Sequence, residues 1–217
     1  VPRRSFLQRF LAGSVVAVGV TPALAGCAAP GGSPAPANEL ETGLAGMQGT
    51  EKVIYDATSP AGGTNGLLYA RNFLKFSTDK LGTTDAQMSV IVSFRHFATP
   101  YGYNDAMWAK YPQFSAMLSV TDPKTKKPAA RNVPLTDDAE GFDGTSIPKL
   151  SAHGVKYSVC GAATAFIAGV IAGKTGDAKA THAELNAILI PGAVMAPAGV
   201  VAVQRAQKFG FSYTFTG

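Results

Sequence analysis

One cysteine stands where a thiol in an α/β protein can be reactive. Cys160 ends residues 155–160, which predict a buried strand, and Gly161 begins a small-residue segment that predicts a helix. A thiol at a helix N-terminus lies at the positive end of the helix dipole, which favours the thiolate. The pattern leaves two interpretations open: a reactive thiol that carries sulfur, or a small buried apolar side chain, as free cysteines often are.

Five further side chains are candidates for ligand binding. They follow a predicted strand at residues 87–94, and ligands of open α/β sheets bind beyond the carboxyl ends of the strands. Arg95 and His96 end that strand, so they could place positive charge near Cys160 and favour a thiolate or an anionic ligand. The other three stand on a predicted helical turn: Asn104, Asp105 and Trp108. The single tryptophan could stack on a ligand or pack on the core as a lid.

The elements that position these residues are predicted to be strands and helices that alternate along the chain. Period-2 and continuous apolar runs predict strands, and apolar residues at helical spacing predict helices. The predicted strands cover residues 52–58, 87–94, 155–160, 193–196 and 211–215. The predicted helices begin at Thr64 or Asn65 and continue to Leu81, then lie within 144–153 and over 161–173, 181–189 and 199–209. This order predicts an α/β layered fold with a mainly parallel sheet of about five strands.

Two segments interrupt the alternation. Residues 96–113 are aromatic, polar and rich in turn formers, and residues 121–144 are a long polar stretch with three prolines. Loops beyond about 12–15 residues are uncommon unless they are functional or disordered. Both segments follow the second strand, so we expect long inserted loops that cover the carboxyl edge of the sheet.

Residues 1–27 are predicted to be an export signal. They run from a basic start through a short apolar stretch to small residues. Arg3–Leu7 (RRSFL) resembles the twin-arginine motif, which directs export of folded proteins. The alternative is an ordinary secretory signal with a chance arginine pair. Either signal predicts a protein of the periplasm or cell envelope.

The end of the signal has two interpretations. Ala23-Leu24-Ala25 suits simple cleavage, whereas Leu24–Cys27 (LAGC) resembles a lipobox, whose cysteine is lipidated. Under the second interpretation, Cys27 would anchor the protein to a membrane. The residues that follow are rich in Pro, Gly, Ala and Ser and predict a flexible linker over 28–50, ahead of one domain over 51–217.

Composition excludes several classes of protein. The 217 residues are 46% hydrophobic, too apolar for a wholly disordered chain. Two cysteines cannot make a disulfide scaffold, and with three histidines they are too few for the usual zinc clusters, so we expect no metal or cofactor. The formal charge of +5 falls to +2 without residues 1–27, since these hold three of the 19 basic residues and none of the 14 acidic ones. That charge predicts no nucleic-acid partner.

Two segments resemble the DsrE-like sulfur-relay family. Residues 153–160 (HGVKYSVC) are similar to its Gly-Val-x-x-x-x-Cys segment, and residues 190–213 are similar to its closing strand, helix and aromatic strand. Residues 95–111 are similar to exported, uncharacterised members of the same superfamily. The resemblance implies a three-layer fold that assembles as trimers or hexamers. It also implies that Cys160 stands at the position that carries a persulfide in relay members.

Together these features predict an exported DsrE-like protein that binds a small sulfur-containing or anionic ligand and carries sulfane sulfur on Cys160. Relay members are cytoplasmic, so export departs from the family pattern. The alternative is a non-catalytic accessory or assembly subunit of an envelope complex, which would use the fold for homo-oligomerisation. No set of nucleophile, base and orienting residue is identified, so a carrier or binding protein is favoured over an enzyme.

Overall fold

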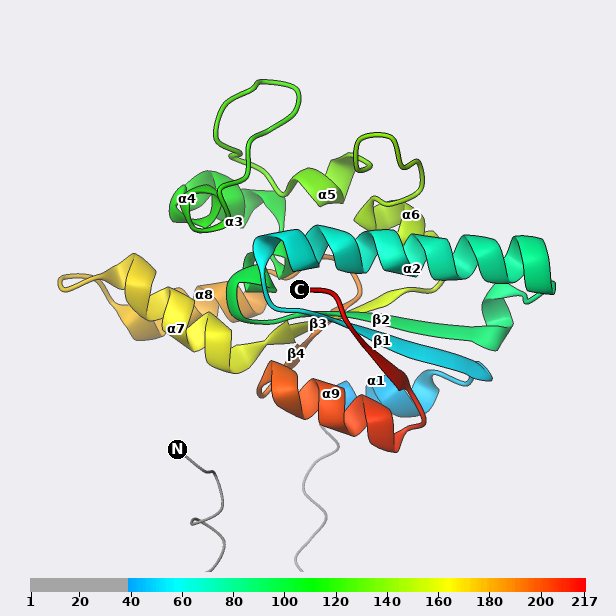
Figure 1. Ribbon diagram of the computed structural model, residues 1–217. Coiled ribbons are helices and arrows are strands. Elements are labelled where there is room, and N and C mark those ends of the chain that lie inside the picture. Colours follow the sequence, from blue (N-terminus) through cyan, green and yellow to red (C-terminus); the bar gives the residue numbers. More distant parts are fainter. Residues whose placement is uncertain (1–38) are drawn as a thin grey trace, which may run out of the picture. The chain divides into compact units, whose positions relative to one another are not determined.

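Short runs of apolar and β-branched residues form one parallel sheet (Figure 1). The computed structural model describes residues 39–217, so the predicted export signal, Cys27 and the first part of the predicted linker lie outside the described residues. The strands are β1 (Glu51–Ala57), β2 (Met88–Phe94), β3 (Lys156–Cys160), β4 (Ala193–Ala196) and β5 (Ser212–Phe215). Their order is β4-β3-β2-β1-β5, and every pairing is parallel.

Helices cover both faces of this sheet, which confirms the predicted three-layer α/β fold. On one face lies α2 (Pro60–Leu81), and on the other lie α1 (Glu39–Gly46) and α9 (Gly199–Lys208). Alternate residues of β2 point to opposite faces: Val90 and Val92 pack in the cluster under α2, and Ile91 packs in the cluster under α9. Burial on both faces explains why most residues of β2 are apolar.

The helix α2 begins one turn earlier than the sequence predicts. Ser59 caps it, since its side chain accepts a hydrogen bond from the Gly62 amide, and Pro60 occupies the first turn. The Gly62-Gly63 pair suggests a turn, yet both residues are helical. A Cβ at Gly62 would lie 2.0 Å from the Gly217 carbonyl oxygen, and one at Gly63 would lie 2.4 Å from the Tyr101 ring. Close packing, rather than a turn, therefore requires these glycines.

The predicted linker is too long at its C-terminal end. Residues 39–46 form α1, whose Leu40 and Leu44 are buried against the sheet. Arg205 of α9 donates from Nη2 to Oε2 of Glu41 at 2.8 Å, which ties the two helices of this face together. The prediction is wrong here because one pair of leucines four residues apart is only a weak signal for a helix. The apolar surface on which they pack belongs to the sheet, whose strands come later in the sequence.

Residues 96–113 are mostly helical, so the prediction of a long inserted loop is wrong for this segment. It contains a 3₁₀ helix, η2 (His96–Gly102), then α3 (Asp105–Lys110), and it leads into α4 (Gln113–Leu118). Its aromatic residues pack on one another, which is why the segment is ordered despite its polar residues and turn formers. Tyr101, Trp108 and Phe114 form successive ring contacts with centroids 5.8 and 6.0 Å apart.

Residues 121–144 follow the prediction more closely, since α5 (Val133–Thr136) is their one helix. The segment is held by polar contacts. Arg131 donates from Nε to Asp122 at 2.6 Å, and this pair with two backbone amides holds the pKa of Asp122 at about 2. Asn132 donates from Nδ2 to the carbonyl oxygens of Tyr101 and Tyr103, both at 2.8 Å. α6 (Ile147–Ala152) follows and leads into β3.

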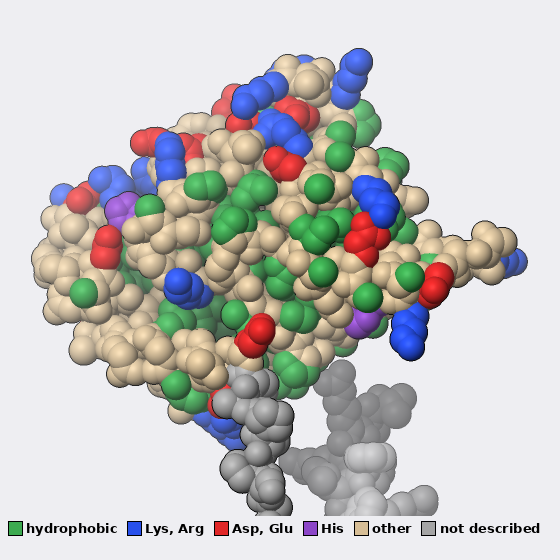
Figure 2. Space-filling model, turned by 180° about the vertical axis from the view of Figure 1, so that it is seen from behind, with side chains coloured by type: hydrophobic (Ala, Val, Ile, Leu, Met, Phe, Trp, Pro, Cys, Tyr) green, Lys and Arg blue, Asp and Glu red, His purple; other side chains and the backbone are tan. Residues whose placement is uncertain are grey.

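Two helices follow β3 beyond the carboxyl ends of the strands (Figure 1). They are α7 (Gly161–Ala172) and α8 (Ala178–Ala187), which pack against each other. No helix within residues 39–217 has the length and apolar character needed to cross a membrane. On the face in Figure 2, basic and acidic side chains are interspersed rather than gathered into one patch of a single sign.

Candidate functional site

A crevice opens where the chain leaves β3 and β4 for opposite faces of the sheet. α7, which follows β3, packs through Ile167 and Ala168 into the cluster under α2. α9, which follows β4, packs through Ala202 and Ala206 into the opposite cluster. Adjacent parallel strands whose connections diverge in this way leave a ligand crevice at their carboxyl ends.

The Cys160 thiol lies at the floor of this crevice. Cys160 is the last residue of β3, pairs in register with Ala196 of β4, and is 6% exposed. Its Sγ accepts hydrogen bonds from the Ala163 amide at 3.4 Å and from the Gly199 amide at 3.1 Å. These amides belong to the first turns of α7 and α9. Two helix N-termini therefore converge on one sulfur, an arrangement that stabilises negative charge there.

Two glycines allow close approach of neighbouring segments at this crevice. A Cβ at Gly161 would lie 2.8 Å from the Ala196 carbonyl oxygen, and the neighbouring Ala162 amide donates to the Pro197 carbonyl at 3.1 Å. A Cβ at Gly199 would lie 2.6 Å from Cβ of Arg95. Neither glycine is among the site residues predicted from the sequence. In the sequence, they could have been found as glycines at the first position of a helix that follows a strand. A close backbone approach at such a position requires a residue without a side chain.

A cavity of about 300 Å³ opens above the thiol. Cys160, Arg95 and His96 all line it, so the structure brings together the three residues that were predicted to converge. The rest of the wall is largely apolar and includes Phe97 and Phe166. Residues 121–144 do not contribute to this wall, so the expectation that both inserted segments cover the site holds only for the first.

The Arg95 guanidinium is directed to Asp56. Nε of Arg95 donates to Oδ1 of Asp56 at 2.6 Å, and Nη2 donates to Oδ2 at 2.7 Å. Tyr213 donates from its hydroxyl to the same Oδ2 at 2.9 Å. The Asp56 side chain is 1% exposed, and its hydrogen bonds with Arg95 raise the pKa of that guanidinium. The sequence signal for this pair was an aspartate among the apolar residues 53–57 of β1.

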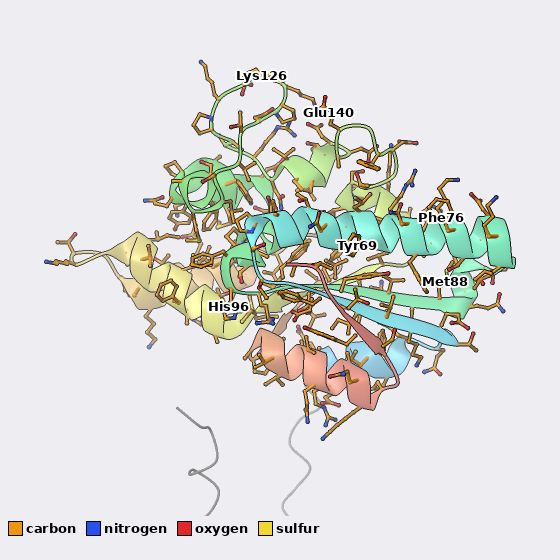
Figure 3. The ribbon with its side chains drawn as sticks, viewed as in Figure 1. Tyr69, Phe76, Met88, His96, Lys126 and Glu140 are labelled. Atoms are coloured by element: carbon orange, nitrogen blue, oxygen red, sulfur yellow. The ribbon has the colours of Figure 1, made fainter. Side chains whose placement is uncertain are left out.

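His96 is exposed and enters the crevice from the end of β2. It begins η2 with a φ of 51°, a left-handed conformation that is uncommon outside glycine. Figure 3 labels His96 near the N-terminal ends of α7 and α9, in agreement with its place in the cavity wall. Of the two basic side chains in the wall, Arg95 forms an ion pair with Asp56, whereas His96 forms none within residues 39–217.

Asn104, Asp105 and Trp108 lie away from this cavity. Asn104 caps α3 by accepting from the Met107 amide at 3.3 Å, and Asp105 accepts from the Asn132 amide at 2.8 Å. The Trp108 ring is fully buried and donates from Nε1 to the Pro100 carbonyl at 3.0 Å. Of the two interpretations of the tryptophan, packing on the core agrees with this position.

The fold and the crevice define the class: a parallel α/β protein with a thiol held between two helix N-termini at the carboxyl edge of its sheet. No protein-family model, curated protein or solved structure matches the chain. The DsrE-like resemblance therefore stays a prediction from the residues quoted above. Across residues 39–217, no group of three His, Cys, Asp or Glu side chains is placed to hold a metal ion.

Proposed function

We propose that this protein carries sulfane sulfur on Cys160 and takes it from a small sulfur-containing donor that enters the cavity above the thiol. The observation that supports this most is the pair of amide hydrogen bonds to Sγ at 3.1 and 3.4 Å. Backbone amides stabilise an anionic sulfur in a fixed position, which both a thiolate and a bound persulfide require. The DsrE-like resemblance points to the same role, and the predicted signal would place it in the cell envelope.

The transfer needs no oxidant or reductant. The Cys160 thiolate attacks the outer sulfur of a donor R–S–SH, and a new bond forms between Sγ and that sulfur. The S–S bond of the donor breaks, and its electron pair leaves with the thiolate RS⁻. The proton stays on the transferred sulfur, so Cys160 becomes Cys–S–SH. Transfer to an acceptor thiolate reverses these steps.

The test uses the full chain with Cys27→Ala, which leaves Cys160 as its one thiol. After incubation with an organic persulfide, peptide mass spectrometry is expected to show one added sulfur on the Cys160 peptide, lost on reduction. A Cys27→Ala/Cys160→Ala chain should gain none. Iodoacetamide should also modify Cys160 in the folded protein at pH 7. A thiol that reacts only after denaturation would make Cys160 a core residue and would contradict the proposal.

A second candidate function is that of an assembly or accessory subunit, and α7 favours it. This helix has no charged residue over Gly161–Ala172, yet Phe166 is 64% exposed and Val170 is 50% exposed. A helix that is apolar all round is normally buried. Homo-oligomerisation through this helix would cover the exposed side chains.

Association is expected at micromolar concentration in sedimentation velocity experiments, and Val170→Asp should shift the protein to the monomer. Val170 does not line the Cys160 cavity, so sulfur loading should survive the change. Thr78→Asp is the matched control, because it adds the same charge to an exposed position of α2. A wild-type protein that sediments as a monomer would count against assembly as a function.

A further inference from the structure

A chain of contacts connects the buried acid Asp56 to the thiol. Asp56 holds both Nε and Nη2 of Arg95, and the Arg95 amide donates to the Ala57 carbonyl at 3.0 Å. Arg95 is therefore fixed to β1 by its side chain and by its backbone. Tyr213, on the edge strand β5, donates a hydrogen bond from its hydroxyl to Oδ2 of Asp56. Arg95 has little freedom to turn its guanidinium elsewhere.

The aliphatic stem of Arg95 is the part that faces the thiol site. A Cβ placed on Gly199 would lie 2.6 Å from Cβ and 2.7 Å from Cδ of Arg95, so the stem lies directly on this glycine. Of the two hydrogen bonds that Cys160 Sγ accepts, the one from the Gly199 amide is the shorter. The stem thus packs against the residue that presents this N–H to the sulfur.

The positive charge of Arg95 is neutralised by its ion pair with Asp56. From the end of β2 the titratable groups near the thiol are Arg95, which is paired with Asp56, and His96. The Tyr103 hydroxyl donates to Thr164 of α7 at 2.8 Å; burial is the main cause that raises the pKa of Tyr103, and the nearby Cys160 adds to that shift. Neither α7 nor the first turn of α9 carries a titratable side chain. Main-chain amides and His96 remain as the groups that can favour an anionic sulfur.

We infer that Arg95 is a positioning residue for Cys160. Its aliphatic stem, held on Gly199 by the contacts of Arg95 with Asp56, keeps the Gly199 amide directed at Sγ, and its guanidinium charge pairs with Asp56 rather than with the thiol. The inference rests on the proposed sulfur chemistry of Cys160, and it assigns the positive character of the site to backbone amides. It differs from the expectation that Arg95 acts on the thiol or on an anionic ligand through its charge.

Two double variants separate the stem from the charge, both in the Cys27→Ala chain. Asp56→Asn/Arg95→Gln removes both charges and keeps most of the stem, whereas Asp56→Asn/Arg95→Ala also removes the stem. The readout is the rate of Cys160 alkylation across pH 5–10. The first variant is expected to keep the wild-type pH profile, with rates within about twofold. The second should alkylate about tenfold more slowly at pH 7, as expected when one hydrogen bond to an ionised group is lost.

Gly199→Ala is an independent test that leaves Asp56 and Arg95 intact. Its methyl group would meet the Arg95 stem and push the amide away from Sγ, so it should slow alkylation as the stemless variant does. Circular dichroism checks that each variant is folded at the assay temperature. A pH profile that moves upward in Asp56→Asn/Arg95→Gln would show that the charge matters and would overturn the inference. A wild-type Cys160 that resists alkylation at every pH would instead contradict the proposed function.

Discussion

Arg95→Ala is expected to lower the free energy of unfolding by about 3 kcal/mol. The substitution leaves Asp56, whose side chain is 1% exposed, with the Tyr213 hydroxyl as the remaining side-chain donor to its carboxylate. A buried carboxylate without its cation has lost its hydration and has no partner charge to compensate. Removing one partner of a buried ion pair therefore costs more stability than removing both. Urea denaturation followed by circular dichroism measures the effect.

The control for this prediction is the double variant Asp56→Asn/Arg95→Ala. Removing the charge of Asp56 together with its partner should recover most of the lost stability, because no unpaired charge then stays buried. Arg205→Ala offers a second comparison, since its ion pair with Glu41 is about one-third exposed on both sides and should cost much less. Equal losses for Arg95→Ala and Arg205→Ala would show that the burial of Asp56 does not matter for stability.

Trp108→Ala is expected to lower the free energy of unfolding by about 3–5 kcal/mol. The ring is fully buried, it contacts Tyr101 and Phe114, and its Nε1 donates to the Pro100 carbonyl. Its removal leaves a cavity between η2 and α4 and takes one of two hydrogen bonds from the Pro100 carbonyl, which still accepts from the Tyr103 backbone amide at 3.1 Å. Thermal or urea denaturation of the purified variant measures the loss.

Trp108→Phe distinguishes a core role from ligand binding. Phenylalanine keeps an aromatic ring in the cluster, so the loss of stability should be clearly smaller than for alanine. Sulfur loading of Cys160 should not change, because Trp108 does not line the cavity. A Trp108→Phe protein that is stable but no longer accepts sulfur would instead support the interpretation that this ring contacts a ligand.

Local patterns were enough to predict most of the architecture. The strands at 52–58, 87–94 and 155–160 lie within a residue or so of β1, β2 and β3. The run at 87–94 is the most informative, because a strand buried on both faces needs apolar side chains at most positions. The same patterns placed Cys160 at the junction of a strand and a helix, and the rule for parallel sheets put Arg95 and His96 at the same edge.

Weaker local signals failed where the partner is remote. Residues 39–46 form a helix because Leu40 and Leu44 pack on an apolar face of the sheet. The sequence of residues 39–46 does not indicate that this face exists. The aromatic residues of 96–113 likewise look like a variable loop until they meet one another in η2, α3 and α4. Burial of these side chains stabilises the short helices, which would be marginal on their own.

By itself the sequence determined the class of fold, the edge of the sheet where a site could lie, and the thiol at that edge. Only the tertiary structure decided what surrounds the thiol. The direction of the Arg95 guanidinium depends on Asp56, which is 39 residues away, and on Tyr213 of the edge strand. The two amides that reach Sγ come from helices that follow different strands. Such contacts depend on how strands pair and on which face each connection crosses, and local residue patterns carry no information about either.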